Sequence, residues 1–308
     1  MEKDNKETFD DEIDLLELFL IAWNRKRFII ILTSAFAIFS IFYSLSLPNI
    51  YTSSSLLAPS NQNNAASSPN FTGMSGLASL AGVNLSSSST TKSDEAIERI
   101  RSFEFFTNYF LPSIKLEDLM AIDKWIAKSN TIVYNEDIFN GETKKWVNIE
   151  GDSKKISPSS QKAFRKYKQI LNVYEDEITG FVTISIQHQS PIVAKDWVEL
   201  IIYNINESMR ELDKQDAQNA INFLSQSSNS TNVQSIREVI NRILETKMQT
   251  LMLASTNKAY IFKTIDSPIA PEVKSGPARS FICVMGTLIG GIISLLIVFI
   301  NHRIRKPN

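Results

Sequence analysis

FIIILTSAFAIFSIFYSLSL (residues 28–47) and FICVMGTLIGGIISLLIVFI (residues 281–300) are two uncharged apolar runs, one near each end of the chain. Each is about 20 residues long, and a helix of that length extends about 30 Å, the thickness of a bilayer's hydrocarbon core. We therefore expect two membrane-spanning helices. The alternative for the first run is a cleavable signal peptide, but its apolar core is long and an acidic segment precedes it. The alternative for the second run is a buried core helix.

Basic residues beside the two runs predict the orientation, because Lys and Arg next to a span are retained in the cytoplasm. Arg25, Lys26 and Arg27 precede the first run, and Arg303, Arg305 and Lys306 follow the second. From residue 28 to residue 91 the chain has no Asp, Glu, Lys, Arg or His. Lys274 and Arg279, just before the second run, weaken the asymmetry locally. The pattern predicts that both termini lie in the cytoplasm and that residues 48–280 lie outside it, which in a cell with two membranes is the periplasm.

Composition and missing motifs exclude several function classes. The 308 residues carry 32 Lys+Arg and 33 Asp+Glu, so no net positive field attracts nucleic acid. A single cysteine, Cys283, and two histidines, His188 and His302, argue against a metal site or a cysteine–histidine hydrolase. No GxxxxGK[ST] or GxGxxG motif occurs, so we expect no nucleotide cofactor. We predict no catalytic residue, because His188 and the adjacent carboxylates fit structural or exposed positions better.

The sequence between the two apolar runs, residues 48–280, predicts a mixture of strands and helices. Residues 50–59 and 259–266 are strand candidates, and residues 172–188 predict a β-hairpin around Thr179-Gly180. Helices are expected over 93–111, over LEDLMAIDKWIA (116–127) and over 159–171, while the Ser/Asn-rich stretch 59–91 is expected to be mostly loop. Within that stretch, FTGMSGLASLAGV is either a short docked helix or a loose linker. The fold class is therefore α+β.

Two long helices are expected next. Apolar residues recur at three- and four-residue steps, and neither Gly nor Pro occurs from Ile192 to Ser267. The stripes are Val198, Ile201, Ile205, Met209, Leu212, Ala220 and Phe223, then, after a break at 227–232, Val233, Ile236, Ile240, Ile243, Met248 and Leu251. A first helix of about 35 residues extends roughly 50 Å, so we expect a protruding pair of helices.

These observations divide the chain into consecutive parts. The expected parts are a cytoplasmic tail (1–27), a transmembrane helix (28–47), a periplasmic α+β base domain (48–189), a long helical protrusion (190–255), a return strand with a Pro-rich segment (256–280), a second transmembrane helix (281–300) and a cytoplasmic tail (301–308). The tail before the first span is expected to hold a helix that begins near Asp10 or Asp11. That helix either lies on the membrane surface or extends the span.

Two clusters near the second run are candidate functional residues. Pro268, Pro271 and Pro277 share a three-residue register, the period of polyproline II, which predicts a stiff strut into the membrane unless the segment is a generic linker. Gly286 and Gly290 form a GxxxG motif beside Gly291, and such motifs allow close approach of two membrane helices. The partner helix is the first span of the same or a neighbouring subunit, or a polymerase; otherwise this face contacts lipid.

The layout and several segments resemble the chain-length determinant proteins of bacterial surface polysaccharide, the polysaccharide co-polymerases of the Wzz type. The matching segments are EIDLLELFLIAWNRKR, IYTSSSLLAP, GLASLAGV and QTLMLASTNKAYIFKTIDSPIAP. Residues 100–230 match by helix pattern only, and Lys274 stands where such proteins often have a further Pro.

The resemblance implies a homo-oligomer that works with the O-antigen polymerase on the growing lipid-linked polysaccharide and sets its length without being an enzyme. The alternatives are an adaptor of a capsule or exopolysaccharide export machine and an activator of a separate tyrosine kinase. A two-span receptor with an external ligand domain fits poorly, because neither tail is long enough for an output domain. A glycosyl hydrolase or transferase is the enzymatic alternative.

Overall fold

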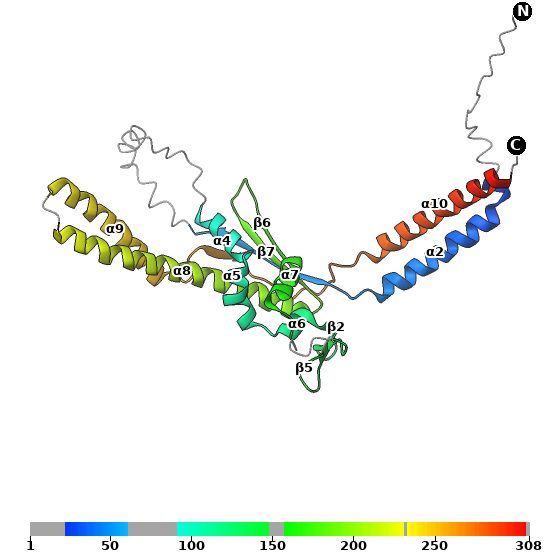
Figure 1. Ribbon diagram of the computed structural model, residues 1–308, viewed down its shortest axis with the longest axis horizontal. Helices are drawn as coiled ribbons and strands as arrows, with labels where there is room; N and C mark the ends of the chain where they lie inside the picture. The colour runs from blue at the N-terminus through cyan, green and yellow to red at the C-terminus, as the bar shows by residue number, and fades with distance from the viewer. Residues whose placement is uncertain (1–21, 61–90, 148–156, 231–232, 306–308) are drawn as a thin grey trace, which may run out of the picture. The chain divides into compact units, whose positions relative to one another are not determined.

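A computed structural model describes residues 22–60, 91–147, 157–230 and 233–305 (Figure 1). The chain forms two compact units, one from Met1–Asn49 with Ser275–Asn308 and one from Ile50–Lys274. The predicted helix near Asp10, the short segment FTGMSGLASLAGV and most of the loop 59–91 lie outside the described residues. The predicted α+β class is confirmed: helices and antiparallel strands build the second unit.

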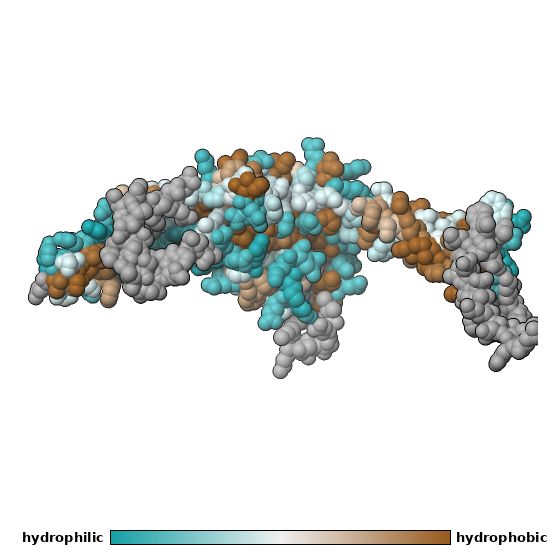
Figure 2. Space-filling view, turned by 90° about the horizontal axis from the view of Figure 1, so that it is seen from above, coloured by the Kyte–Doolittle hydropathy of each residue, from teal (hydrophilic) through white to brown (hydrophobic). Residues whose placement is uncertain are grey.

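The first unit is a pair of antiparallel helices, α2 (Lys26–Ser46) and α10 (Arg279–Arg305). Both are long and apolar enough to cross a membrane, over Lys26–Ser46 and Arg279–His302. These spans contain almost all of the predicted runs. Little of either helix is buried, and Figure 2 shows apolar surface along the pair. Exposed apolar side chains of this density are stable in lipid rather than in water.

A four-stranded antiparallel sheet organises the second unit, in the order β6-β7-β1-β8. The strands are β1 (Tyr51–Pro59), β6 (Leu171–Glu175), β7 (Val182–His188) and β8 (Phe262–Asp266). The predicted hairpin is present: β6 and β7 are joined by a turn in which Gly180 has φ +68°, a value that glycine adopts without strain. The sheet therefore brings together segments from the beginning and the end of the unit.

Buried serines on β1 attach the return segment, residues 257–274, to the sheet. Ser55 Oγ donates a hydrogen bond to the carbonyl of Asp266 (2.6 Å), and Ser53 Oγ donates to the carbonyl of Ile269 (2.8 Å). Both serines are almost fully buried. Because each hydroxyl has a partner, its burial is not penalised.

The predicted helix 93–111 is broken into short pieces. They are α4 (Lys92–Ile100), α5 (Phe103–Phe105), a π-helical turn η3 (Phe106–Phe110) and a 3₁₀ turn η4 (Leu111–Ser113). Thr91 and Asp94 form a capping box at the start of α4. Ser102 then adopts an extended conformation and its side chain accepts a hydrogen bond from the Phe105 N–H, which begins a new helix. A second helix cap inside the run thus overrides the helical periodicity.

The predicted helix 116–127 is wrong in its second half. Only α6 (Leu116–Met120) is helical; β2 (Ile122–Ile126) and β3 (Thr131–Tyr134) then form a hairpin. In that hairpin Asn130 has φ +48° and its Oδ1 accepts from Trp125 Nε1 (3.0 Å). Asparagine tolerates this left-handed conformation, so the turn is a local signal that periodicity does not reveal. A small pair, β4 (Phe139–Asn140) and β5 (Lys145–Trp146), follows.

The core of the second unit is rich in aromatic side chains. The α7 helix (Ser160–Ile170), capped by Ser159, places the buried Tyr167 ring 4.8 Å from that of Phe110. Trp197 meets Phe110 edge-on at 5.4 Å, and the Tyr167 hydroxyl donates to the carbonyl of Ile100 (3.0 Å). Aromatic pairs at such separations add to the stabilisation from burial.

A helical hairpin extends from this core (Figure 1). The α8 helix (Pro191–Ser230) has 40 residues and packs against α9 (Gln234–Thr256) and, nearer its start, against β1 and β7. The stripe residues Val198, Ile201, Ile205 and Met209 are buried. Phe223, further along the same predicted stripe, is 68% exposed. The first half of α8 therefore belongs to the core, and beyond it α8 pairs with α9.

Candidate functional site

The glycine motif of the second apolar helix lies against the first apolar helix of the same chain. A Cβ at Gly286 would come within 2.6 Å of Ser40 Cβ, and one at Gly290 within 2.5 Å of Phe36 Cβ. A Cβ at Gly291 would meet nothing within 4 Å. Gly286 and Gly290 thus allow a helix approach that any larger residue prevents, whereas Gly291 takes no part in it.

Two serines on α2, which the sequence analysis did not single out, complete this contact. Ser40 Oγ donates to the carbonyl of Ile282 (2.9 Å), and Ser44 Oγ lies 3.5 Å from the carbonyl of Arg279. Ser44 is only 1% exposed. Their four-residue spacing places both on one face of α2, as the glycines lie on one face of α10. In the sequence, the only sign of this contact was that small residues recur four positions apart in both apolar runs.

Arg279 joins the ends of the two helices. Its guanidinium donates to the carbonyl of Leu47 (3.3 Å) and to Asn49 Oδ1 (3.1 Å). The Leu47 carbonyl lies at the C-terminal end of α2, where an orphan acceptor and the helix dipole both favour a cation. Arg279, which weakened the charge asymmetry in the sequence, therefore has a structural role at this end.

The three prolines lie in different surroundings. Pro268 is buried and lies beside a groove of the second unit, Pro271 follows in an irregular segment, and Pro277 belongs to the first unit after a cis peptide bond. The irregular segment has no helix or strand between β8 and α10. The structure brings Pro268 to a candidate site; it does not bring the other two there.

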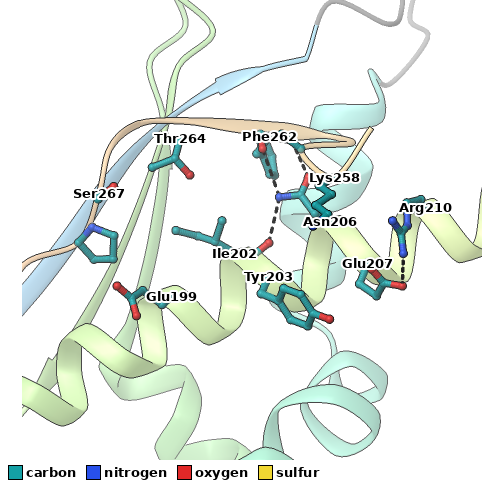
Figure 3. A pocket seen from close by; sticks show the side chains of 12 residues that line it. Glu199, Ile202, Tyr203, Asn206, Glu207, Arg210, Lys258, Phe262, Thr264 and Ser267 are labelled. Atoms are coloured by element: carbon teal, nitrogen blue, oxygen red, sulfur yellow. Dashed lines mark hydrogen bonds and ion pairs between the residues drawn. The ribbon is translucent and has the colours of Figure 1, made fainter. Parts of the chain in front are cut away.

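A groove of about 500 Å³ lies between α8 and the return segment of the second unit (Figure 3). Asn206, on α8, makes its floor: Oδ1 accepts from the Ile261 and Phe262 N–H groups (2.8 and 2.9 Å), and Nδ2 donates to the Phe262 carbonyl (3.2 Å) and the Ile202 carbonyl (3.0 Å). One buried amide therefore pairs with the Ile261 N–H and with both the N–H and the carbonyl of Phe262, and so holds the beginning of β8 on α8.

Polar and aromatic groups surround this floor. Glu207 and Arg210 form an ion pair (2.5 Å), while Glu199 lines the other end of the groove and Lys258 faces α8 from the return segment. Tyr203 is 65% exposed, although it lies on α8 next to buried residues. The groove thus combines hydrogen-bond donors, acceptors and an accessible aromatic ring, which suit a polyhydroxylated ligand.

A partly buried carboxylate fixes α8 to two other segments near this groove. Asp213 accepts a hydrogen bond from the Tyr260 hydroxyl and forms an ion pair with Lys92. Burial, and then the hydrogen bond to Asp213, raise the pKa of Tyr260 above its usual range. Lys92 also lies 5.7 Å from the centre of the Tyr260 ring. The three residues connect the beginning of α4, the middle of α8 and the segment after α9.

His188 has a structural environment. It is buried; its Nδ1 accepts from the Ser190 N–H (3.0 Å) and its Nε2 lies 2.9 Å from the Asp118 carbonyl. Nε2 must therefore carry the proton, and both nitrogens of the neutral ring are satisfied. Burial lowers the pKa of His188 below its usual value. Among the described residues, no three His, Cys, Asp or Glu side chains are grouped so as to hold a metal ion.

The outer part of the α8–α9 hairpin exposes apolar side chains on both helices. Phe223 on α8 and Met252 on α9 are each about two-thirds exposed, and Ile236, Val239 and Met248 are about half exposed. Exposed apolar side chains grouped in this way are typical of interaction surfaces.

A sequence model of one family matches this chain. The family is described as Wzz, chain length determinant protein, and the match covers residues 11–108, which include α2, β1 and α4. The resemblance predicted from the sequence is thereby confirmed. No curated protein sequence matches the chain.

Solved structures of similar proteins include a full-length bacterial polysaccharide co-polymerase, with 14% identity, a TM-score of 0.38 and coverage of 96% of this chain and 99% of the other. They also include a fragment of WzzB, the polysaccharide co-polymerase from Salmonella Typhimurium, with 13% identity, a TM-score of 0.29 and coverage of 74% and 100%.

Proposed function

We infer that this chain is an inner-membrane regulator of surface-polysaccharide length, and that it acts as a homo-oligomer together with a polysaccharide polymerase. The observation that carries the proposal is the family match over residues 11–108, the part of the chain that contains the first apolar helix and β1. The two apolar helices fit a two-pass membrane protein. The proposed substrate of the polymerase is the lipid-linked O-antigen, and the chain itself performs no catalytic step.

The proposed orientation has both termini in the cytoplasm and Ile50–Lys274 in the periplasm. The support is the basic cluster Arg25–Arg27 at the beginning of α2 and Arg303 and Arg305 at the end of α10. Alkaline phosphatase fused after Ser93 should be active, because it folds only in the periplasm, and a fusion at the C-terminus should be inactive. The reverse pattern would contradict this orientation.

The proposed homo-oligomer buries the exposed apolar surface of the α8–α9 hairpin against identical neighbours, because identical neighbours in a closed ring cover it on every subunit. Protein in mild detergent should scatter light as a species several times the 34.8 kDa of one chain, after the detergent is subtracted. A monomer at micromolar concentration in several mild detergents would contradict the ring.

The proposed contact with the growing polysaccharide is the groove between α8 and the return segment. Its exposed Tyr203 ring offers a flat apolar face, and Arg210 and Lys258 offer donors to hydroxyl or carboxyl groups. Tyr203→Ala should shift the length distribution. The matched control is Tyr174→Ala, because Tyr174 on β6 is 61% exposed and does not line the groove. Equal effects of the two variants would exclude a specific role of the groove.

The function is tested by separating the polysaccharide by size in strains with and without the chain. Loss of a length regulator should replace a preferred length by a broad, mostly short distribution, with polymer still at the surface. Complete loss of surface polymer would favour the export adaptor instead, and an unchanged preferred length would refute the proposal.

A further inference from the structure

A second cleft lies in the first unit, between the beginning of α2 and the end of α10. Its volume is about 370 Å³. The walls are apolar on one side, from Phe28, Ile297 and Val298. Four polar residues, Asn24, Arg25, Asn301 and His302, line the rest. Because both helices contribute, the cleft exists only when α2 and α10 are paired.

The polar groups of this cleft lack partners in the part of the chain that the structure describes. Arg25 forms no ion pair with any described carboxylate. His302 Nε2 is buried and has no hydrogen-bond partner there. A buried polar atom without a hydrogen-bond partner costs free energy. The unpaired imidazole nitrogen of His302 and the cationic guanidinium of Arg25, which line the same cleft, therefore favour a bound anion that accepts hydrogen bonds.

The surroundings place the cleft at the level of lipid headgroups. It lies at the end of both apolar spans, beside the exposed Trp23 and next to Lys26, whose ammonium lies 4.6 Å from the centre of the Trp23 ring. Tryptophan and lysine concentrate at the membrane–water interface. A phosphate at that depth belongs to a lipid, whose acyl chain can follow the apolar wall.

We propose that this cleft binds the phosphate headgroup of an anionic phospholipid. Arg25 holds the phosphate with two parallel N–H bonds, and His302 and the two asparagine amides donate to the remaining oxygens. Basic pockets between membrane helices are known to select anionic lipids over neutral ones. The bound lipid joins α2 to α10 at the end opposite to Arg279. This inference does not depend on the proposed function.

Native mass spectrometry of the full chain, released from mild detergent after titration with phosphatidylglycerol, measures the binding. Arg25→Gln should weaken phosphatidylglycerol binding about tenfold, because it removes the charge that faces the phosphate. Arg27→Gln is the matched control: it removes an equal charge from the same end of α2, at an exposed residue outside the cleft. It should change binding less than about twofold.

Two further variants and two further ligands complete the test. His302→Ala should also weaken binding, and Arg25→Lys, which keeps the positive charge needed for insertion, should bind more weakly than the unchanged chain and more tightly than Arg25→Gln. Phosphatidylcholine should bind at least about tenfold more weakly than phosphatidylglycerol. Millimolar inorganic phosphate should not displace the lipid.

Equal losses in Arg25→Gln and Arg27→Gln would show general surface attraction and overturn the proposal. Unchanged binding in Arg25→Gln or His302→Ala, equal binding of phosphatidylcholine, or displacement by inorganic phosphate would each overturn it too.

Discussion

The helix pair of the first unit and the core of the second unit are held together by opposite kinds of residue. Between α2 and α10, Gly286 lies against Ser40 and Gly290 against Phe36, and Ser40 and Ser44 approach backbone carbonyls of α10, so two backbones approach closely. In the second unit, large rings such as Phe110 and Tyr167 fill the space between elements. Burial of apolar surface drives folding in water, but lipid is as apolar as any side chain. Close backbone contact and hydrogen bonds therefore stabilise the helix pair instead.

The largest expected effect is in the aromatic core. Phe110→Ala removes a fully buried ring that contacts Tyr167 and Trp197, and should destabilise the second unit by about 3–5 kcal/mol. Phe223→Ala, at an exposed ring on α8, should change the stability of the monomeric chain by less than about 0.5 kcal/mol. Thermal unfolding in detergent measures both. Similar losses in the two variants would contradict the described core.

The buried amide of Asn206 comes next. Asn206→Ala leaves the Ile261 and Phe262 N–H groups without their acceptor and should cost about 1–3 kcal/mol, with faster hydrogen exchange at these two amides. Gln218→Ala, at an exposed residue on the same helix, is the control. If exchange at residues 261 and 262 stays unchanged, the amide does not hold the return segment on α8.

The glycine contact has a smaller and more local expected effect. Leu at both Gly286 and Gly290 should separate α2 from α10, at a cost of about 1–2 kcal/mol, while insertion is preserved because Leu is favourable in lipid. Gly291→Leu adds the same side chain where nothing lies within 4 Å, and should leave the pair intact. Cysteine cross-linking between the two helices in membranes measures the difference. Equal cross-linking in the two variants would refute the contact.

The smallest expected effect is the pH dependence from His188. The folded state lowers the pKa of this imidazole by burial, so it binds fewer protons than the unfolded state, whose histidine titrates near 6.5. Stability should therefore be complete above about pH 6.5 and fall as the pH is lowered below it. His188→Gln should show a flatter dependence between about pH 6.5 and 5. If its slope equals that of the unchanged chain, His188 does not titrate in this way.

Residues with a strong local signal were predictable from the sequence, and residues whose role depends on a distant segment were not. The two apolar runs, the hairpin around Gly180 and the buried stripe from Val198 to Met209 are set by hydropathy and turn chemistry. The breaks at Ser102 and Asn130 arise from side-chain hydrogen bonds that compete with helix periodicity.

In the candidate sites, the glycine motif predicted that a second helix packs against α10, but it did not identify α2 of the same chain as that helix. Asn206, which binds residues 55 positions away, left no sequence pattern at all.

The length distribution of surface polysaccharide in a deletion strain, complemented in turn by three forms of the chain, tests the central claim most directly. The account predicts that the unchanged chain and Gly291→Leu restore one preferred length, and that the variant with Leu at both Gly286 and Gly290 gives a shorter or broader distribution at equal membrane levels. A deletion strain that keeps its preferred length, or a doubly substituted variant that restores it in full, would contradict the account.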